Sequence, residues 1–105
     1  MHISLETGNS AARIIVEGVV DESGAARLKK CLEGVDLSEV TEVIFDFLHL
    51  SYIGSSGVGK LLLFYKQARE KGIGVRIENL PPSVYELFMQ LHLDALFPLV
   101  QREES

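Results

Sequence analysis

The chain has 105 residues, 47% of them apolar, so it has the length and the apolar content for one domain with a core of its own. Ten Lys and Arg stand against 15 Asp and Glu, and the net charge of −5 argues against a nucleic-acid-binding surface, which needs clustered positive charge. The one cysteine, Cys31, excludes an internal disulfide and a cysteine-rich metal site, and no run of about 20 apolar residues predicts a membrane-spanning helix.

The first third of the chain predicts a β-hairpin followed by a helix. Apolar and polar residues alternate over residues 3–7, a Gly-Asn pair favours a turn, and residues 12–17 are expected to form the second strand. Asp21 offers a cap for a helix that starts after it, with acid in the first turn where the helix dipole favours it. The helix is expected to end near Gly34. Its apolar residues recur at helical spacing: Ala25, Leu28, Cys31 and Leu32.

The middle of the chain predicts a central strand, a loop and the longest helix. Residues 42–48 are rich in β-branched and aromatic residues, as in a buried strand, and residues 49–54 are expected to form a loop. The helix is expected to begin at Ser55 and to end at Gly72. Its predicted apolar stripe consists of Val58, Leu61, Leu62, Tyr65 and Ala68.

The last third of the chain predicts a strand, two helical segments and a final strand. Residues 73–79 are expected to form the strand, and the Pro-Pro-Ser run at 81–83 starts a helix. A short helical turn over 93–96 and a strand over 98–101 follow, and residues 102–105 are expected to be an unstructured tail. The buried side of the helix is expected to consist of Val84, Leu87, Phe88 and Leu91.

This order of elements, ββαβαβααβ, predicts an α/β fold. Because helices alternate with strands after an initial hairpin, we expect a mixed sheet of about five strands with helices packed on it, in a single domain over residues 1–101. The basic residues at 27–30 and 66–71 are expected to form solvated helix faces.

The densest local signal is the run Gly-Ser-Ser-Gly-Val-Gly-Lys over residues 54–60. Its outer glycines and Lys60 fit the spacing of a phosphate-binding P-loop, but Leu61 stands where that loop needs Ser or Thr for magnesium. A nucleophilic serine would need a base and an acid beside it, and a Gly-x-Ser-x-Gly elbow is absent. No recognisable motif contains any of the three histidines, His2, His49 and His92. Both interpretations are therefore disfavoured, and we expect no catalytic residue, metal or cofactor.

A regulatory serine at a helix N-terminus is the third interpretation. The free N–H groups of a first helical turn attract anions, so a phosphate on Ser55 would lie over them. Small glycine neighbours would leave the hydroxyl reachable. The alternative is that Ser55 or Ser56 is only the N-cap of the helix. The local pattern leaves both alternatives open.

The segment from Val43 to Gly59 resembles the signature of STAS domains, in which a strand ending in Asp or Asn is followed by Asp-Ser-Ser-Gly and a helix. The resemblance covers nearly the whole chain. Gly18-Val-Val-Asp21 is similar to the Gly-x-x-Asp at the end of the family's second strand, and residues 81–88 and 93–97 are similar to its closing helix and Gly-Leu-x-x-x-Phe turn. The resemblance implies the STAS fold and the role of an anti-sigma factor antagonist, a bacterial regulatory module that is not an enzyme.

Antagonists of this kind bind a serine-kinase anti-sigma factor and release the sigma factor that it holds. The kinase phosphorylates the first serine of the motif, which breaks the complex, and a phosphatase, expected to be of PP2C type, restores it. Carried over to this chain, the resemblance implies phosphorylation of Ser55. The implied partner-binding residues are Asp21, Gly54, Ser55, Ser56, Gly57 and Val58. Without a signal peptide or a membrane-inserted segment, we expect a cytoplasmic protein.

Two positions depart from the family pattern. Gly54 stands where the family usually has Asp, which removes a carboxylate beside the serine. This departure motivates an alternative function, a STAS module that is never phosphorylated, either a stress-signalling scaffold or the small subunit of a lipid-transport complex. His92 replaces a Gly before Leu93, where a left-handed cap is expected that His tolerates less readily. Asp46, at a polar position of the family, is expected to tie down the loop after the central strand.

Overall fold

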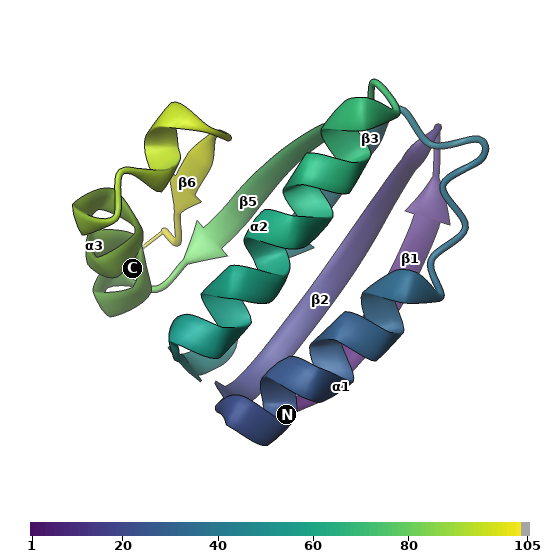
Figure 1. Ribbon diagram of the computed structural model, residues 1–105. Helices are drawn as coiled ribbons and strands as arrows, with labels where there is room; N and C mark the ends of the chain where they lie inside the picture. The colour runs from purple at the N-terminus through teal and green to yellow at the C-terminus, as the bar shows by residue number, and fades with distance from the viewer. Residues whose placement is uncertain (104–105) are drawn as a thin grey trace.

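The structure, a computed structural model, describes residues 1–103, which fold into a mixed sheet with helices on it (Figure 1). The α/β fold expected from the sequence is confirmed. In chain order the elements are β1 (His2–Gly8), β2 (Ala11–Val20), α1 (Glu22–Glu33), β3 (Glu42–Asp46), β4 (Leu50–Ile53), α2 (Ser55–Glu70), β5 (Gly74–Leu80), α3 (Pro82–Gln90), the 3₁₀ helix η1 (Leu93–Ala95) and β6 (Leu99–Gln101).

The sheet has the strand order β1-β2-β3-β5-β6, with β4 paired to β2 off this path. The predicted hairpin is confirmed: β1 and β2 are antiparallel, with Leu5 opposite Ile14, whereas all other pairings are parallel. Its turn has two residues, Asn9 and Ser10, with positive φ values of 52° and 62°. This backbone matches the right-handed twist of a hairpin. Both strands are longer than the sequence pattern predicted.

Residues 49–54 are not a loop, so that prediction is wrong. Leu50–Ile53 is a parallel strand on β2, with Tyr52 opposite Val19 and Ile53 opposite Val20. Its two end residues are buried and its two middle residues are exposed. A strand of four residues with this pattern lacks the alternation by which a half-buried strand is recognised. The sheet has six strands, in keeping with the expected mixed sheet of about five, and β4 lies between β3 and α2 in the chain.

Helices α1 and α2 lie side by side across one face of the sheet (Figure 1). The ring of Phe64 on α2 meets that of Phe45 on β3 edge-on, with centroids 5.6 Å apart. Each such buried side chain contributes roughly 1.5–3 kcal/mol of burial free energy. The predicted stripe of α2 omitted Phe64, which is buried, and included Leu62 and Tyr65, which are half-buried. Cys31 on α1 and Leu91 after α3 are exposed, so their predicted places among buried residues are wrong.

The other face of the sheet carries charged side chains that alternate with the core residues. Arg13 on β2 reaches Asp46 on β3 at 3.0 Å and Glu78 on β5 at 2.8 Å. The hydrogen bond to Glu78 raises the pKa of Arg13 above its ordinary value. Asp46 also accepts from the Leu48 N–H and the Asn79 amide, each at 3.1 Å. The prediction that Asp46 ties down the following loop is confirmed.

The C-terminal elements follow β5 and end with β6, the edge strand beside it. The short helical turn and the final strand expected there are confirmed as η1 and β6. His92, before η1, is left-handed with φ 59° and ψ 31°, as the family pattern implied. Arg102, in the predicted tail, donates its N–H to the Leu80 carbonyl at 2.8 Å. Residues 104–105 of that tail lie outside the described residues. Over the described part of the chain, no helix combines the length and the apolar character needed to cross a membrane.

Candidate partner-binding site at the start of helix α2

Strand β4 leads into α2 through one residue, Gly54. The Gly54 N–H donates to the Val20 carbonyl at 3.0 Å, and Val20 is paired with Ile53. The ends of β2 and β4 therefore lie side by side. Asp21 follows β2 and Ser55 follows Gly54, so the sheet brings both predicted residues to the same edge. Asp21 and Ser55, 34 positions apart in the sequence, thus share one surface.

Ser55 and Ser56 are the first two residues of α2, and both are exposed. The N-cap is Gly54, which has extended backbone and no side chain to accept a hydrogen bond. The alternative that one of the serines caps the helix is therefore wrong. Neither serine side chain has a hydrogen-bond partner within residues 1–103. Both hydroxyl groups are free to meet another molecule.

The first turn of α2 has an uncompensated positive end. Val58 is the first residue whose N–H bonds back along the helix, to the Gly54 carbonyl at 3.1 Å. The three N–H groups before it have no intrahelical partner, as at the start of any helix. No acidic residue lies in this turn. The partial positive charge of the helix end therefore faces outward around Ser55.

Helix α1 begins beside the start of α2 and, unlike α2, has a side-chain cap. Asp21 is its N-cap, and its Oδ1 accepts from the Gly24 N–H at 2.8 Å and from the Ser23 hydroxyl at 3.3 Å. The hydrogen bond from Gly24 lowers the pKa of Asp21 below its ordinary value. Asp21 is exposed and ionised, and its first role is to cap α1.

Gly57 lets the start of α2 rest directly on the sheet. A Cβ added to it would lie 2.8 Å from side-chain carbons of both Ile53 and Val20, closer than atoms approach in proteins. Val58 is also buried, in the core. Of the six residues expected at the partner surface, Gly57 and Val58 lie beneath it and set the position of the helix. Asp21, Ser55 and Ser56 are exposed, and Gly54 is half-buried.

Two exposed apolar side chains adjoin these residues and were not predicted as part of the site. Tyr52 is 54% exposed and Val19 46% exposed, and they lie opposite each other on β4 and β2. A Cβ on Gly54 would lie 3.0 Å from the Tyr52 hydroxyl oxygen. A side chain at position 54 would therefore require the Tyr52 side chain to move by a few tenths of an ångström. We call Val19, Asp21, Tyr52, Ser55 and Ser56 together the α2-start surface.

The sequence could not reveal this pair because residues 49–54 were predicted as a loop. For a residue in a loop, the sequence does not predict to which side the Tyr52 side chain points. Once β4 is known to be a strand on β2, the register places Tyr52 beside Val19. Val19 and Tyr52 thus form an exposed apolar pair at the end of β2 and β4 that leads into α2.

The geometry gives no support to the two enzymatic interpretations. A P-loop needs a loop between strand and helix, whereas here one residue connects β4 to α2 and Lys60 lies within the helix. His49 precedes β4 and Ser55 follows it, so the four residues of that strand, roughly 13 Å, separate them. Across residues 1–103, no three His, Cys, Asp or Glu side chains come together as a metal site would require.

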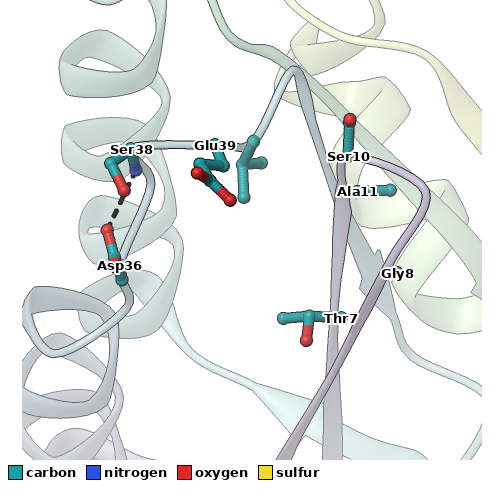
Figure 2. Close-up of a pocket in the computed structure, with 8 residues that line it drawn as sticks. Thr7, Gly8, Ser10, Ala11, Asp36, Ser38 and Glu39 are labelled. Atoms are coloured by element: carbon teal, nitrogen blue, oxygen red, sulfur yellow. Dashed lines mark hydrogen bonds between the residues drawn. The ribbon is translucent and has the colours of Figure 1, made fainter.

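A polar hollow of about 590 Å³ lies at the opposite end of β2. Figure 2 shows Thr7 and Ser10 of the hairpin on one side of this hollow and Asp36, Ser38 and Glu39 of the α1–β3 connection on the other. Asp36 accepts from the Ser38 N–H at 3.0 Å, and this bond lowers its pKa. The ten residues of β2, roughly 33 Å, separate this hollow from the α2-start surface, so the two are independent features.

Comparison with known proteins agrees with this architecture. The family model described as STAS domain matches residues 3–105. The fold is similar to that of the Bacillus cell fate determinant SpoIIAA in its phosphorylated form, at 21% identity and a TM-score of 0.74, covering 97% of this chain and 93% of that one. It is similar to an anti-sigma factor antagonist from Mycobacterium paratuberculosis, at 23% identity and a TM-score of 0.79, covering 94% and 84%.

A protein of another functional class has the same fold. The chain resembles a sulfate transporter family protein from Wolinella succinogenes at 15% identity and a TM-score of 0.74, covering 90% of this chain and 80% of that one. At such identities these structures show the fold alone. The family model, in contrast, spans almost every residue described above. The chain belongs to the STAS domain family.

Proposed function

We propose that this chain is an anti-sigma factor antagonist that binds a serine-kinase anti-sigma factor through the α2-start surface and is switched by phosphorylation of Ser55. The observation that carries the proposal is the exposed Ser55 at a helix start without a side-chain cap or an acidic residue in its first turn. Membership of the STAS family and the likeness to solved antagonists support it. The complex works in the cytoplasm, and a phosphatase of PP2C type reverses the modification.

The switch is electrostatic. A phosphate on Ser55 adds between one and a half and two negative charges and meets the free N–H groups of the first turn, so its own chain accommodates it. A partner that packs on Val19 and Tyr52 would have to desolvate that charge, which costs free energy unless a cation is supplied. Because Gly57 seats α2 tightly on the sheet, the modification acts through charge and not through refolding of the helix.

Gly54 affects the same switch. An Asp at this position would repel a phosphate on the next residue, and its absence removes that repulsion. Tyr52 lies against Gly54 and offers its exposed ring and hydroxyl to the partner instead. The partner of this chain is therefore expected to place an apolar group against Tyr52. The partner of a relative with Asp at this position would instead place a hydrogen-bond donor there.

The experiment uses the serine-kinase anti-sigma factors of the source organism, each purified and incubated with this chain and ATP. Intact mass is expected to show the addition of one phosphate to the wild type and to Ser56→Ala, and none to Ser55→Ala. Binding to the cognate kinase, measured by calorimetry, is expected to weaken at least about tenfold for Ser55→Asp, because the variant places a negative charge in the interface. A tenfold loss of affinity corresponds to about 1.4 kcal/mol. Equal binding of Ser55→Asp and wild type, together with phosphorylation that survives Ser55→Ala, would contradict the proposal.

The second candidate function is a STAS module that is never phosphorylated, a stress-signalling scaffold or the small subunit of a lipid-transport complex. The observation that favours it is Tyr52 over Gly54, which gives the site an apolar character in place of the family's carboxylate. In this case no kinase adds a phosphate, and Ser55→Ala and Ser55→Asp baits recover the same partners from the native cell. Stoichiometric addition of one phosphate at Ser55 would exclude this candidate.

A further inference from the structure

Strand β1 is an unguarded sheet edge. It pairs with β2 over all seven residues without a register shift, and within residues 1–103 no strand lies on its outer side. Such an edge offers a row of N–H and C=O groups to another chain, and proteins commonly block it with Pro, Lys or a bulge. The sequence of β1, His-Ile-Ser-Leu-Glu-Thr-Gly, contains neither of those residues, and the pairing with β2 contains no bulge.

The side of β1 that faces α1 is apolar and incompletely covered. Ile3 packs against the edge of the core, whereas Leu5 is 48% exposed. Both line a groove of about 250 Å³ between β1 and the end of α1, together with Ile14, Leu32 and Val35. A strand added beside β1 would cover Leu5 and extend the sheet under this groove.

The residues of β1 match those of a second, antiparallel β1. When the two strands are centred on Ser4, Ile3 of each lies opposite Leu5 of the other, and His2 of each lies opposite Glu6 of the other. The apolar pairs lie on the groove side, and the His–Glu pairs lie on the other side, because side chains alternate along a strand. Moving the centre by two residues, to Glu6, would place the carboxylates opposite each other. Centring on Ile3 or Leu5 would place His2 or Glu6 opposite Ser4, so the register centred on Ser4 is the one that pairs His2 with Glu6 as well as Ile3 with Leu5.

We propose that β1 pairs with β1 of a second copy of this chain about a two-fold axis at Ser4, which forms a dimer with one continuous sheet. The interface is small, roughly below 1,200 Å², and contacts of that size associate weakly and reversibly. We expect a dissociation constant on the order of 100 μM, within the range of sedimentation equilibrium. The dimer uses no residue of the α2-start surface, so this inference stands independently of the proposed function.

Charge exchange provides the test. Sedimentation of the full chain without an N-terminal tag is measured from about 5 μM to about 1 mM. His2→Glu places Glu opposite Glu at two pairs of its own dimer and is expected to dimerise at least about tenfold more weakly than wild type. Glu6→Lys removes both His–Glu pairs and is also expected to dimerise more weakly than wild type. An equimolar mixture places Glu opposite Lys at one pair and His opposite Glu at the other, and is expected to associate more strongly than either variant alone.

Leu5→Lys is the disruptive variant, and Val100→Lys on the opposite edge strand β6 is its matched control, since Val100 is 49% exposed. Leu5→Lys is expected to be monomeric at every concentration, with a circular dichroism spectrum unchanged from wild type, and Val100→Lys is expected to dimerise as wild type does. A wild type that stays monomeric at about 1 mM overturns the proposal. So does a dimer that persists in Leu5→Lys, or a charge mixture that is no stronger than either variant alone.

Discussion

The packing of the start of α2 against the sheet can be tested by the same substitution at two glycines of this helix. Gly57 is buried against Val20 and Ile53, and Gly59 is exposed with nothing within 4 Å of an added Cβ. Gly57→Ala and Gly59→Ala each add one methyl group, and both raise the helix propensity of the position by the same amount. The difference between them therefore measures the packing of α2 on the ends of β2 and β4.

The two effects have opposite signs. Gly59→Ala is expected to stabilise the fold by about 0.5–1 kcal/mol, because Ala restricts the unfolded chain and favours the helix. At Gly57 the new methyl would lie 2.8 Å from two carbons, where about 3.5–4.0 Å is favourable. Overpacking of this kind costs about 1–3 kcal/mol, and both neighbours are buried and β-branched. Gly57→Ala is therefore expected to destabilise the fold by about 1–2 kcal/mol after its gain in propensity.

Urea and thermal unfolding would measure both variants. About 1 kcal/mol corresponds to a shift of roughly 4–8 °C in a domain of this size, so the two melting temperatures should lie on opposite sides of the wild type. An equal m-value would show that the change lies in stability and not in the unfolded state. If Gly57→Ala proves as stable as Gly59→Ala, α2 does not rest on the strand ends as described.

Two further substitutions test the backbone around the site and beyond it. Asp21→Ala, which removes the acceptor for the Gly24 N–H, is expected to lower the melting temperature at pH 7, whereas Asp21→Asn keeps an acceptor and is expected to lower it less. That bond lowers the pKa of Asp21, so the stabilisation from the ionised side chain is complete above pH 3.8 and is lost as the pH falls through the lower pKa of the folded state. The melting temperatures of wild type and Asp21→Asn should therefore converge in acid. A difference between them that stays constant with pH would refute the assignment. His92→Gly is expected to stabilise the fold by about 0.5–1 kcal/mol in urea unfolding, because Gly adopts the left-handed backbone without strain. His92→Ala retains the strain and should show no gain, and equal gains in both variants would place the effect in the imidazole instead.

The local patterns of the sequence predicted most elements well. The hairpin, the cap at Asp21 and the long helix from Ser55 each follow from residues within a few positions of one another. The strand at 50–53 was missed because its partner lies on β2, some 30 residues earlier, and only pairing with that strand shows that it is extended. Cys31 has the spacing of a core residue on α1, yet it lies at the margin of the helix face and remains exposed.

The candidate site divides in the same way. The sequence by itself determined that two serines stand at the start of the longest helix, in a pattern similar to that of the STAS family, because helix starts and motifs are local properties. Only the tertiary structure decided that Gly54, and not a serine, is the N-cap, and that Tyr52 lies over it. It also decided that Gly57 serves packing, because the contact partners of a residue depend on which distant strands the fold places against it.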